Sequence, residues 1–146
     1  MKYGRHRSVA GRLSALVRAE MGDVLAGADC VVPVPLHWTR HWTRGFNQAA
    51  DLAKGLGLPV VHGLARARRT ASQTTLSSGR RHANVKGAFV VQHGRVPRIL
   101  RGRTVVLVDD VCTTGATLEA CARVLVGAGV REVRAVTVAR AVLGRR

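Results

Sequence analysis

The chain has 146 residues and carries 24 lysine and arginine residues against 8 aspartate and glutamate residues, a formal net charge of +16. This length suits a single domain, residues 1–146, with a real hydrophobic core, and the charge makes anionic partners the first expectation. The three cysteines form no Cys-x-x-Cys pair, which argues against a disulfide framework or a zinc ribbon. No apolar run approaches the roughly 20 residues of a membrane span, and the basic N-terminus lacks the apolar core of a signal peptide, so we expect a cytoplasmic protein.

The first half of the chain alternates helical and extended patterns. Apolar residues at helical spacing predict a helix over 8–26, and a strand follows over 29–35, where two prolines mark its end. An apolar stripe over 46–56 predicts a second helix, and Val60 and Val61 form a short strand.

Residues 66–87 are polar, basic and rich in serine and threonine, which is long for a loop inside a compact domain. We interpret the segment as a mobile loop that acts as a lid, and a disordered excursion is the alternative. Between Asp51 and Asp109 there is no acidic residue, so the basic side chains there line a polyanion site or form a solvated face. They are Lys54, Arg66, Arg68, Arg69, Arg80, Arg81, Lys86, Arg95, Arg98, Arg101 and Arg103.

The second half continues the alternation. We expect a strand over 88–91, a basic connection over 96–103, a buried strand over 104–108, a helix beginning near Leu118, and a last strand over 133–139. Strands that alternate with helices predict an α/β fold, a doubly wound parallel sheet flanked by helices.

The most informative stretch runs from Val105 to Thr117, where an aliphatic strand is followed by Asp109, Asp110 and a small, hydroxyl-rich loop. Ligands of open α/β sheets bind at the edge where such strands end. Gly115 permits a tight turn, and exposed N–H groups at a helix N-terminus suit a phosphate. Carboxylates repel phosphate but accept hydrogen bonds from sugar hydroxyls and bind divalent cations, so the stretch predicts a sugar-phosphate site.

This motif resembles the phosphoribosyl-pyrophosphate (PRPP) motif of type I phosphoribosyltransferases. It is neither a Walker loop nor a dinucleotide fingerprint. The structural alternative is a buried strand followed by a polar turn in which Asp110 or a threonine merely caps a helix. Within that family the chain most resembles the competence-protein ComF group, and the resemblance covers nearly the whole chain. The strings that carry it are Lys2-Tyr3-Gly4, Pro33-Val34-Pro35-Leu36-His37, Arg44-Gly45-Phe46-Asn47-Gln48, Arg69-Thr70 with Gln73, Arg80, Asn84-Val85 and Ala88-Phe89.

The resemblance implies that different residues bind different parts of PRPP. Asp109 and Asp110 would be catalytic, holding the ribose 2- and 3-hydroxyls and, through water or directly, Mg²⁺. The 5-phosphate would lie on Thr113, Thr114, Gly115, Ala116 and Thr117. The pyrophosphate would contact Pro35, Leu36, His37, Arg40, Arg44, Arg69 and Arg80.

The implied reaction displaces pyrophosphate from C1 of PRPP by a nitrogen acceptor that the sequence does not name. Hypoxanthine-guanine enzymes carry an aspartate at the position of Thr113, which counts against that subgroup. The alternatives are a non-catalytic PRPP-binding protein or sensor, and a DNA-binding accessory protein of DNA uptake. Nonspecific nucleic-acid binding and a homodimer are further expectations. ComF proteins commonly carry a cysteine-rich zinc segment ahead of the Lys2-Tyr3-Gly4 string, and the printed sequence starts at that point.

Overall fold

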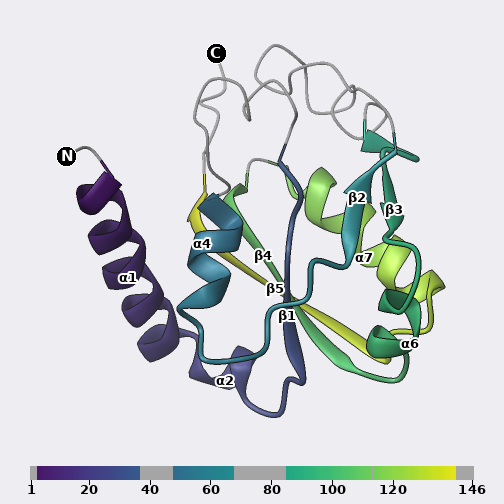
Figure 1. The fold of residues 1–146 in the computed structure, drawn as a ribbon, viewed down its shortest axis with the longest axis horizontal. Coiled ribbons are helices and arrows are strands. Elements are labelled where there is room, and N and C mark those ends of the chain that lie inside the picture. Colours follow the sequence, from purple (N-terminus) through teal and green to yellow (C-terminus); the bar gives the residue numbers. More distant parts are fainter. Residues whose placement is uncertain (1–2, 37–47, 68–84, 113, 141–146) are drawn as a thin grey trace.

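The computed structural model describes residues 3–36, 48–67, 85–112 and 114–140. Three parallel strands form the main sheet, in the order β1 (Cys30–Pro33), β4 (Thr104–Cys112) and β5 (Glu132–Arg140) (Figure 1). Val31 pairs with Val106 across β1 and β4, and Val106 pairs in turn with Arg134 of β5. On the outer side of β1, the strand expected at residues 60–61 is reduced to a single parallel bridge between Val31 and Val60. The parallel sheet predicted from the alternation of strands and helices is confirmed.

Helices cover both faces of this sheet. On one face, α1 (Tyr3–Glu20) and α4 (Gln48–Lys54) pack against Val106 and Val108 of β4. On the other face, α7 (Ala116–Gly127) packs against Val105 and Leu107. All four of these β4 side chains are fully buried, because alternate residues of the strand point to opposite faces and each face is covered. The fold is therefore doubly wound, as predicted.

The two connections leave the sheet in opposite directions. From β1 the chain passes through α4 to Val60 on the outer side, whereas from β4 it passes through α7 to β5 on the far side. The order therefore reverses between β1 and β4. In doubly wound sheets this reversal opens a crevice at the carboxyl ends of the two strands, where ligands bind.

A small antiparallel hairpin lies beside the main sheet. Strand β2 (Leu64–Arg66) pairs with β3 (Phe89–Val91), so the strand expected at 88–91 exists but belongs to a second sheet. Beyond it, α6 (Val96–Leu100) occupies part of the expected basic connection. Pro97 in the first turn is compatible with a helix start, and Leu100 is fully buried, so one apolar anchor holds this short helix in place.

The N-terminal helix differs from its predicted bounds. It ends at Glu20, and a separate short helix, α2 (Gly22–Leu25), follows it, in place of one helix over 8–26. The Ser14 hydroxyl is buried and donates a 3.1 Å hydrogen bond to the Leu52 carbonyl of α4. This contact, with Val17 in the same apolar cluster as Leu52, fixes α1 along α4.

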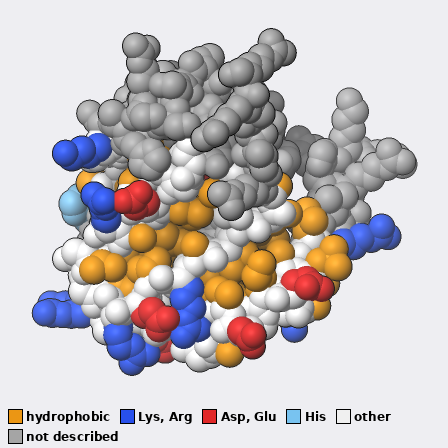
Figure 2. Space-filling view, turned by 180° about the vertical axis from the view of Figure 1, so that it is seen from behind, with side chains coloured by type: hydrophobic (Ala, Val, Ile, Leu, Met, Phe, Trp, Pro, Cys, Tyr) orange, Lys and Arg blue, Asp and Glu red, His pale blue; other side chains and the backbone are white. Residues whose placement is uncertain are grey.

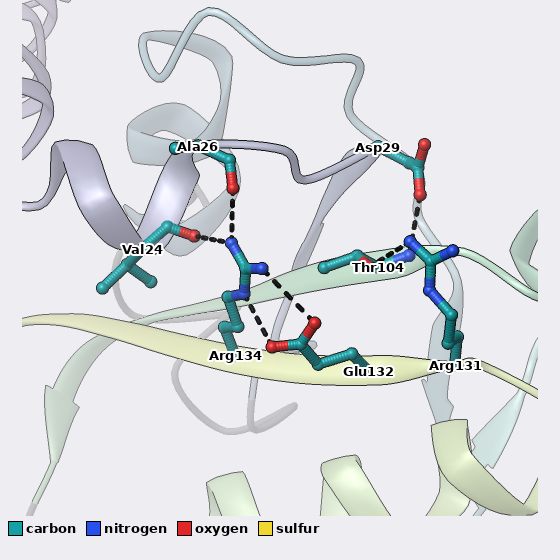
Figure 3. Close-up of polar contacts among 7 residues, drawn as sticks. All are labelled: Val24, Ala26, Asp29, Thr104, Arg131, Glu132 and Arg134. Carbon is teal, nitrogen blue, oxygen red and sulfur yellow. Dashed lines mark hydrogen bonds and ion pairs between the residues drawn. The ribbon is translucent and has the colours of Figure 1, made fainter.

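A polar network ties the chain together at the amino ends of the strands (Figure 3). The Thr104 N–H donates a 2.8 Å hydrogen bond to Asp29, and the Arg131 guanidinium donates to the buried Thr104 hydroxyl at 2.8 Å. Arg134 of β5 donates to the carbonyls of Val24 and Ala26 next to β1 and pairs with Glu132. The hydrogen bond from Thr104, assisted by Arg103, holds the pKa of Asp29 below its ordinary value. The network anchors the α2–β1 connection to β4 and β5.

Among the described helices, none is long and apolar enough to cross a membrane. All three cysteines are free, and two of them, Cys30 and Cys121, are buried. The face seen in Figure 2 has hydrophobic side chains near its centre, with both basic and acidic side chains around them.

Candidate functional site

The candidate site lies at the crevice between the carboxyl ends of β1 and β4. Pro33 pairs with Val108, and the N–H of Val34 donates a 2.9 Å hydrogen bond to the Val108 carbonyl. The chain therefore leaves β1 at the level where β4 reaches its acidic residues. Pro35 and Leu36, two of the residues predicted to contact pyrophosphate, follow at once and are half-buried.

Strand β4 is longer than predicted. Asp109 and Asp110 were expected after the strand, but the parallel pairing with β5 continues to Cys112, so both acids lie inside it. The correction matters because consecutive strand residues point to opposite faces. Asp109 lies on the face that α7 covers, whereas Asp110 lies on the face of α4. The two carboxylates therefore do not face the same space.

Both acids are held by local hydrogen bonds. The Asp110 N–H donates to Oδ1 of Asp109 at 2.9 Å, and the Val111 N–H donates to Oδ1 of Asp110 at the same distance. A carboxylate offers about four lone-pair positions, so these bonds orient the groups and leave capacity for sugar hydroxyls or a cation.

The loop between β4 and α7 has the geometry expected of a phosphate-binding turn. Gly115 precedes the first residue of α7 with φ 82° and ψ 0°, in the left-handed region that favours glycine. A Cβ placed on Gly115 would meet nothing within 4 Å, so a ligand can approach this backbone closely. The alternative, in which Asp110 or a threonine caps the helix, is met in part. The Thr114 hydroxyl accepts a 3.3 Å hydrogen bond from the Ala116 N–H, while the N-cap position itself is Gly115, which offers no side chain.

These elements line one pocket. Its residues come from the end of β4 and the start of α7, and they are Asp109, Val111, Cys112, Gly115, Ala116, Thr117 and Leu118. The amino end of a 12-residue helix directs its N–H groups and positive dipole end toward this space, which favours an anion. Asp109 supplies a hydrogen-bond acceptor beside it. The arrangement suits a ligand that carries both a phosphate and hydroxyl groups.

Arg66 brings a cation to the same side of the sheet. It ends β2, pairs with Phe89 across the hairpin, and places its guanidinium 4.7 Å from the centre of the Phe89 ring. Phe89 belongs to the buried cluster that contains Ala116 and Cys121 of α7. The pKa of the Cys121 thiol is raised to about 12, mainly by burial and in addition by the charge of Asp109, while the charge of Arg66 opposes the rise. The charges of Arg66 and Asp109 thus both affect the pKa of the same buried thiol.

In the sequence, Arg66 was only one of the basic residues that lie between Asp51 and Asp109. The partner that distinguishes it, Phe89, lies 23 positions further along the chain and reaches it through the hairpin. Other predicted site residues lie outside the described part of the chain, namely His37, Arg40, Arg44, Arg69, Arg80 and Thr113. Most of the predicted lid over 66–87 is outside it as well.

Mg²⁺ was the predicted cofactor, and the described residues fit one type of magnesium site. Among them no group of three or more histidine, cysteine or acidic side chains could hold a metal. Mg²⁺ in phosphate-transfer sites usually keeps several waters and binds one or two carboxylates together with substrate phosphates. Asp109, which lines the pocket, can supply the carboxylate of a site of that kind, completed by water and the substrate.

Comparison with known proteins identifies the family. The phosphoribosyl transferase domain family matches residues 42–145. The chain belongs to this family. Relatives of this chain include DNA utilization protein YhgH of Escherichia coli K12, 35% identical over 144 residues, and competence protein F of Haemophilus influenzae, 36% identical over 143 residues. Each alignment covers 92% of this chain and 61% of the relative, so the chain spans about three fifths of their length. These relatives confirm the predicted resemblance to the ComF group.

Solved structures support the phosphoribosyl transferase fold. The structure of the allosteric regulatory enzyme of purine biosynthesis is 25% identical, with a TM-score of 0.58 over 90% of this chain and 26% of that protein. Glutamine PRPP amidotransferase from Bacillus subtilis, complexed with ADP and GMP, is also 25% identical, with a TM-score of 0.55 over 91% of this chain and 26% of that protein. The predicted type I phosphoribosyltransferase-like fold is confirmed.

Proposed function

We propose that this protein binds PRPP together with Mg²⁺ and transfers its phosphoribosyl group to a nitrogen acceptor. The observation that carries the proposal is the pocket in which Asp109 faces the amino end of α7 across the left-handed turn at Gly115. Its position at the reversal of strand order supports the proposal, since such sheets bind nucleotide-like ligands there. The similar Bacillus subtilis protein is a glutamine PRPP amidotransferase, which agrees with this proposal.

Each part of PRPP has a matching chemical environment in the proposed complex. The 5-phosphate lies against the N–H groups of Gly115, Ala116 and Thr117, where the helix dipole favours negative charge. The ribose hydroxyls donate to Asp109. Asp110 lies on the opposite face of β4 and acts only through the end of the strand, where the Val111 N–H donates to it. The pyrophosphate lies toward Pro35 and Leu36 at the end of β1. The predicted basic residues His37, Arg40, Arg44, Arg69 and Arg80 complete its site.

In the proposed reaction the C1–O bond to pyrophosphate breaks, and pyrophosphate leaves with the bonding electrons. A C1–N bond forms from the lone pair of the acceptor nitrogen, which then loses a proton. Positive charge develops on the sugar in the transition state, and the carboxylate of Asp109 stabilises it by lying in a preorganised position. Magnesium, when bound, offsets negative charge on the leaving pyrophosphate.

Calorimetric titration with PRPP in the presence of Mg²⁺ tests the binding half of this proposal. A screen of purine and pyrimidine bases and simple amines for pyrophosphate release then tests the transfer half. We expect saturable, magnesium-dependent PRPP binding and pyrophosphate release with at least one acceptor. Absence of PRPP binding would contradict the site itself.

A second candidate is a PRPP-binding protein without turnover that acts in DNA use. The names of the relatives favour it, because they describe DNA utilization and competence and do not name a transferase. The same two experiments separate the candidates. PRPP binding without pyrophosphate release from any acceptor supports the second.

A further inference from the structure

A second basic feature lies away from the pocket. Arg95, Arg98 and Arg101 are all exposed and occur at intervals of three residues along and beside α6. Residues three apart on a helix lie on the same side, with about 5–6 Å between their Cβ atoms. We call these three arginines the α6 ridge. The opposite side of α6 carries the fully buried Leu100, so the ridge points to solvent.

The α6 ridge is held in a fixed position by the fold. The Arg101 N–H donates to the Pro97 carbonyl at 3.1 Å, and the next residue, Gly102, donates to the Gly129 carbonyl at 2.8 Å. A Cβ on Gly129 would lie only 3.2 Å from Cγ of Arg101, so the Arg101 stem packs against the α7–β5 turn. These contacts hold the ridge next to the α7–β5 turn, at the amino-terminal edge of the sheet.

The charges of the α6 ridge are not neutralised within the described residues. Arg95, Arg98 and Arg101 form no ion pair there, whereas other arginines of this edge do. Asp29 pairs with Arg103, and Glu132 pairs with Arg134, so the neighbouring acids are already engaged. No acidic residue occurs between Asp51 and Asp109 in the sequence. Three adjacent positive charges are thus available to an external anion.

The α6 ridge and the pocket lie at opposite ends of β4. The ridge precedes Thr104, the first residue of the strand, and the pocket is lined by Asp109, Val111 and Cys112 at its other end. Five to eight steps at about 3.3 Å each separate Thr104 from these pocket residues, a distance of roughly 17 to 26 Å. Figure 1 shows α6 at the lower edge and the amino end of α7 near the upper one. One phosphate of a small ligand cannot reach both.

An exposed apolar side chain accompanies the arginines. Ile99, next to Arg98, is 48% exposed, although most large apolar residues of this region are buried. A surface that combines guanidinium groups with an apolar contact suits a partner with phosphates separated by sugars. One guanidinium group can donate two parallel hydrogen bonds to the oxygens of one phosphate. Contacts with phosphates do not depend on the base sequence.

We propose that the α6 ridge is a docking surface for the sugar-phosphate backbone of nucleic acid, separate from the PRPP pocket. Arg95 and Arg98 contact phosphates, Arg101 adds a third cation fixed against Gly129, and Ile99 packs against a sugar. Binding is independent of base sequence and weakens with salt, because each phosphate contact releases counterions.

Two double variants that each remove two positive charges test this proposal. Arg95→Gln combined with Arg98→Gln removes two charges from the ridge, and Arg12→Gln combined with Arg18→Gln removes two exposed charges from α1. Arg101 is kept because its stem is packed. Fluorescence anisotropy with short labelled single-stranded and duplex DNA follows affinity from roughly 50 to 200 mM salt. Circular dichroism checks that each variant is folded.

We expect the ridge variant to lower the salt slope by about 1.8 on duplex and about 1.4 on single strands, which corresponds to two lost phosphate contacts. The α1 variant should keep a slope close to that of the unmodified protein. If both variants lost DNA affinity equally, or if the ridge variant lost none, DNA binding would not depend on the α6 ridge. Either result would overturn the proposal. Anionic lipid vesicles test the other class of anionic partner. If the ridge variant lost binding to these vesicles but kept its DNA binding, the proposal would also be overturned. PRPP affinity should be unchanged in both variants, so a failure of the PRPP proposal is detected separately.

Discussion

The main-chain N–H of Asp110 donates a 2.9 Å hydrogen bond to Oδ1 of Asp109, while the two side chains belong to opposite faces of β4. Adjacent acids in a sequence are easily treated as one functional pair. Here the strand separates them, and only Asp109 lines the pocket. The two residues are therefore expected to contribute unequally.

The first prediction concerns this inequality. Asp109→Asn should weaken PRPP binding by about 1.5–3 kcal/mol, the usual value of hydrogen bonds to a charged group, and Asp110→Asn should weaken it less. The double variant should lose most of the affinity and remain folded. Calorimetric titration with PRPP and Mg²⁺ measures the effect, with Asp51→Asn, a change in an acid of α4, as the control. Unchanged binding in the double variant would rule out the site assignment.

The second prediction uses Cys112 as a reporter for the pocket. Cys112 is half-buried and lines the pocket, whereas Cys30 and Cys121 are buried and desolvation raises the pKa of both thiols. Thiolates are the reactive form, so an alkylating reagent near neutral pH should modify Cys112 first. PRPP with Mg²⁺ should slow that modification. Mass spectrometry of the labelled peptides measures both effects, and labelling of Cys112 at the same rate with and without PRPP would contradict the pocket assignment.

The third prediction concerns the contact between Arg66 and Phe89. Cation–π contacts contribute about 0.5–2 kcal/mol, depending on how far they are removed from water. Arg66→Met should therefore lower the free energy of unfolding by an amount in that range, and Arg66→Lys should recover part of it. If the charge of Arg66 also serves the site, PRPP affinity should fall in the methionine variant and recover with lysine. Urea unfolding and calorimetry separate the two effects, and recovery of stability without recovery of affinity would limit Arg66 to a structural role.

The fourth prediction concerns the packing of α1 on α4. A Cβ at Gly55 would lie 2.3 Å from both Cβ and Oγ of Ser14, so Gly55→Ala should destabilise the fold by about 1–3 kcal/mol through overpacking. Gly11 is an exposed position of α1 where a Cβ would meet nothing within 4 Å. Gly11→Ala should accordingly stabilise the helix by about 0.5–1 kcal/mol. Thermal unfolding compares the two alanine variants, and the same sign of change in both would show that α1 does not pack as described.

The fifth prediction is a pH dependence at the amino edge of the sheet. The hydrogen bond from Thr104 lowers the pKa of Asp29 below the ordinary value of 3.8. The stabilisation from this group is therefore complete above pH 3.8 and is lost as the pH falls through the lower folded value. Asp29→Asn should reduce stability at neutral pH and should flatten the acid side of the stability curve. Urea unfolding of both proteins between neutral and acidic pH measures it, and parallel curves would contradict the assignment.

The sequence by itself determined the fold class and predicted the place of the candidate site. The four consecutive aliphatic residues from Val105 to Val108 identify a strand that is buried on both faces. A strand with one exposed face would instead carry polar residues at alternate positions. The change to small and hydroxyl-bearing residues at Gly115 marks the turn into α7, since glycine alone adopts φ near 80° without strain. Such local signals depend on neighbours within a few residues, and for that reason they can be read from the chain.

Only the tertiary structure decided which groups share a space. β4 continues to Cys112 because β5 pairs with it along that length, and this pairing places Asp109 and Asp110 on opposite faces. The hairpin that sets Arg66 on Phe89 makes the first residue of the predicted loop part of a strand and pairs it with a strand beyond the end of that loop. The α6 ridge likewise depends on a hydrogen bond between Gly102 and Gly129, from two separate turns. Contacts between distant segments follow from packing and register, which no local pattern of residue types encodes.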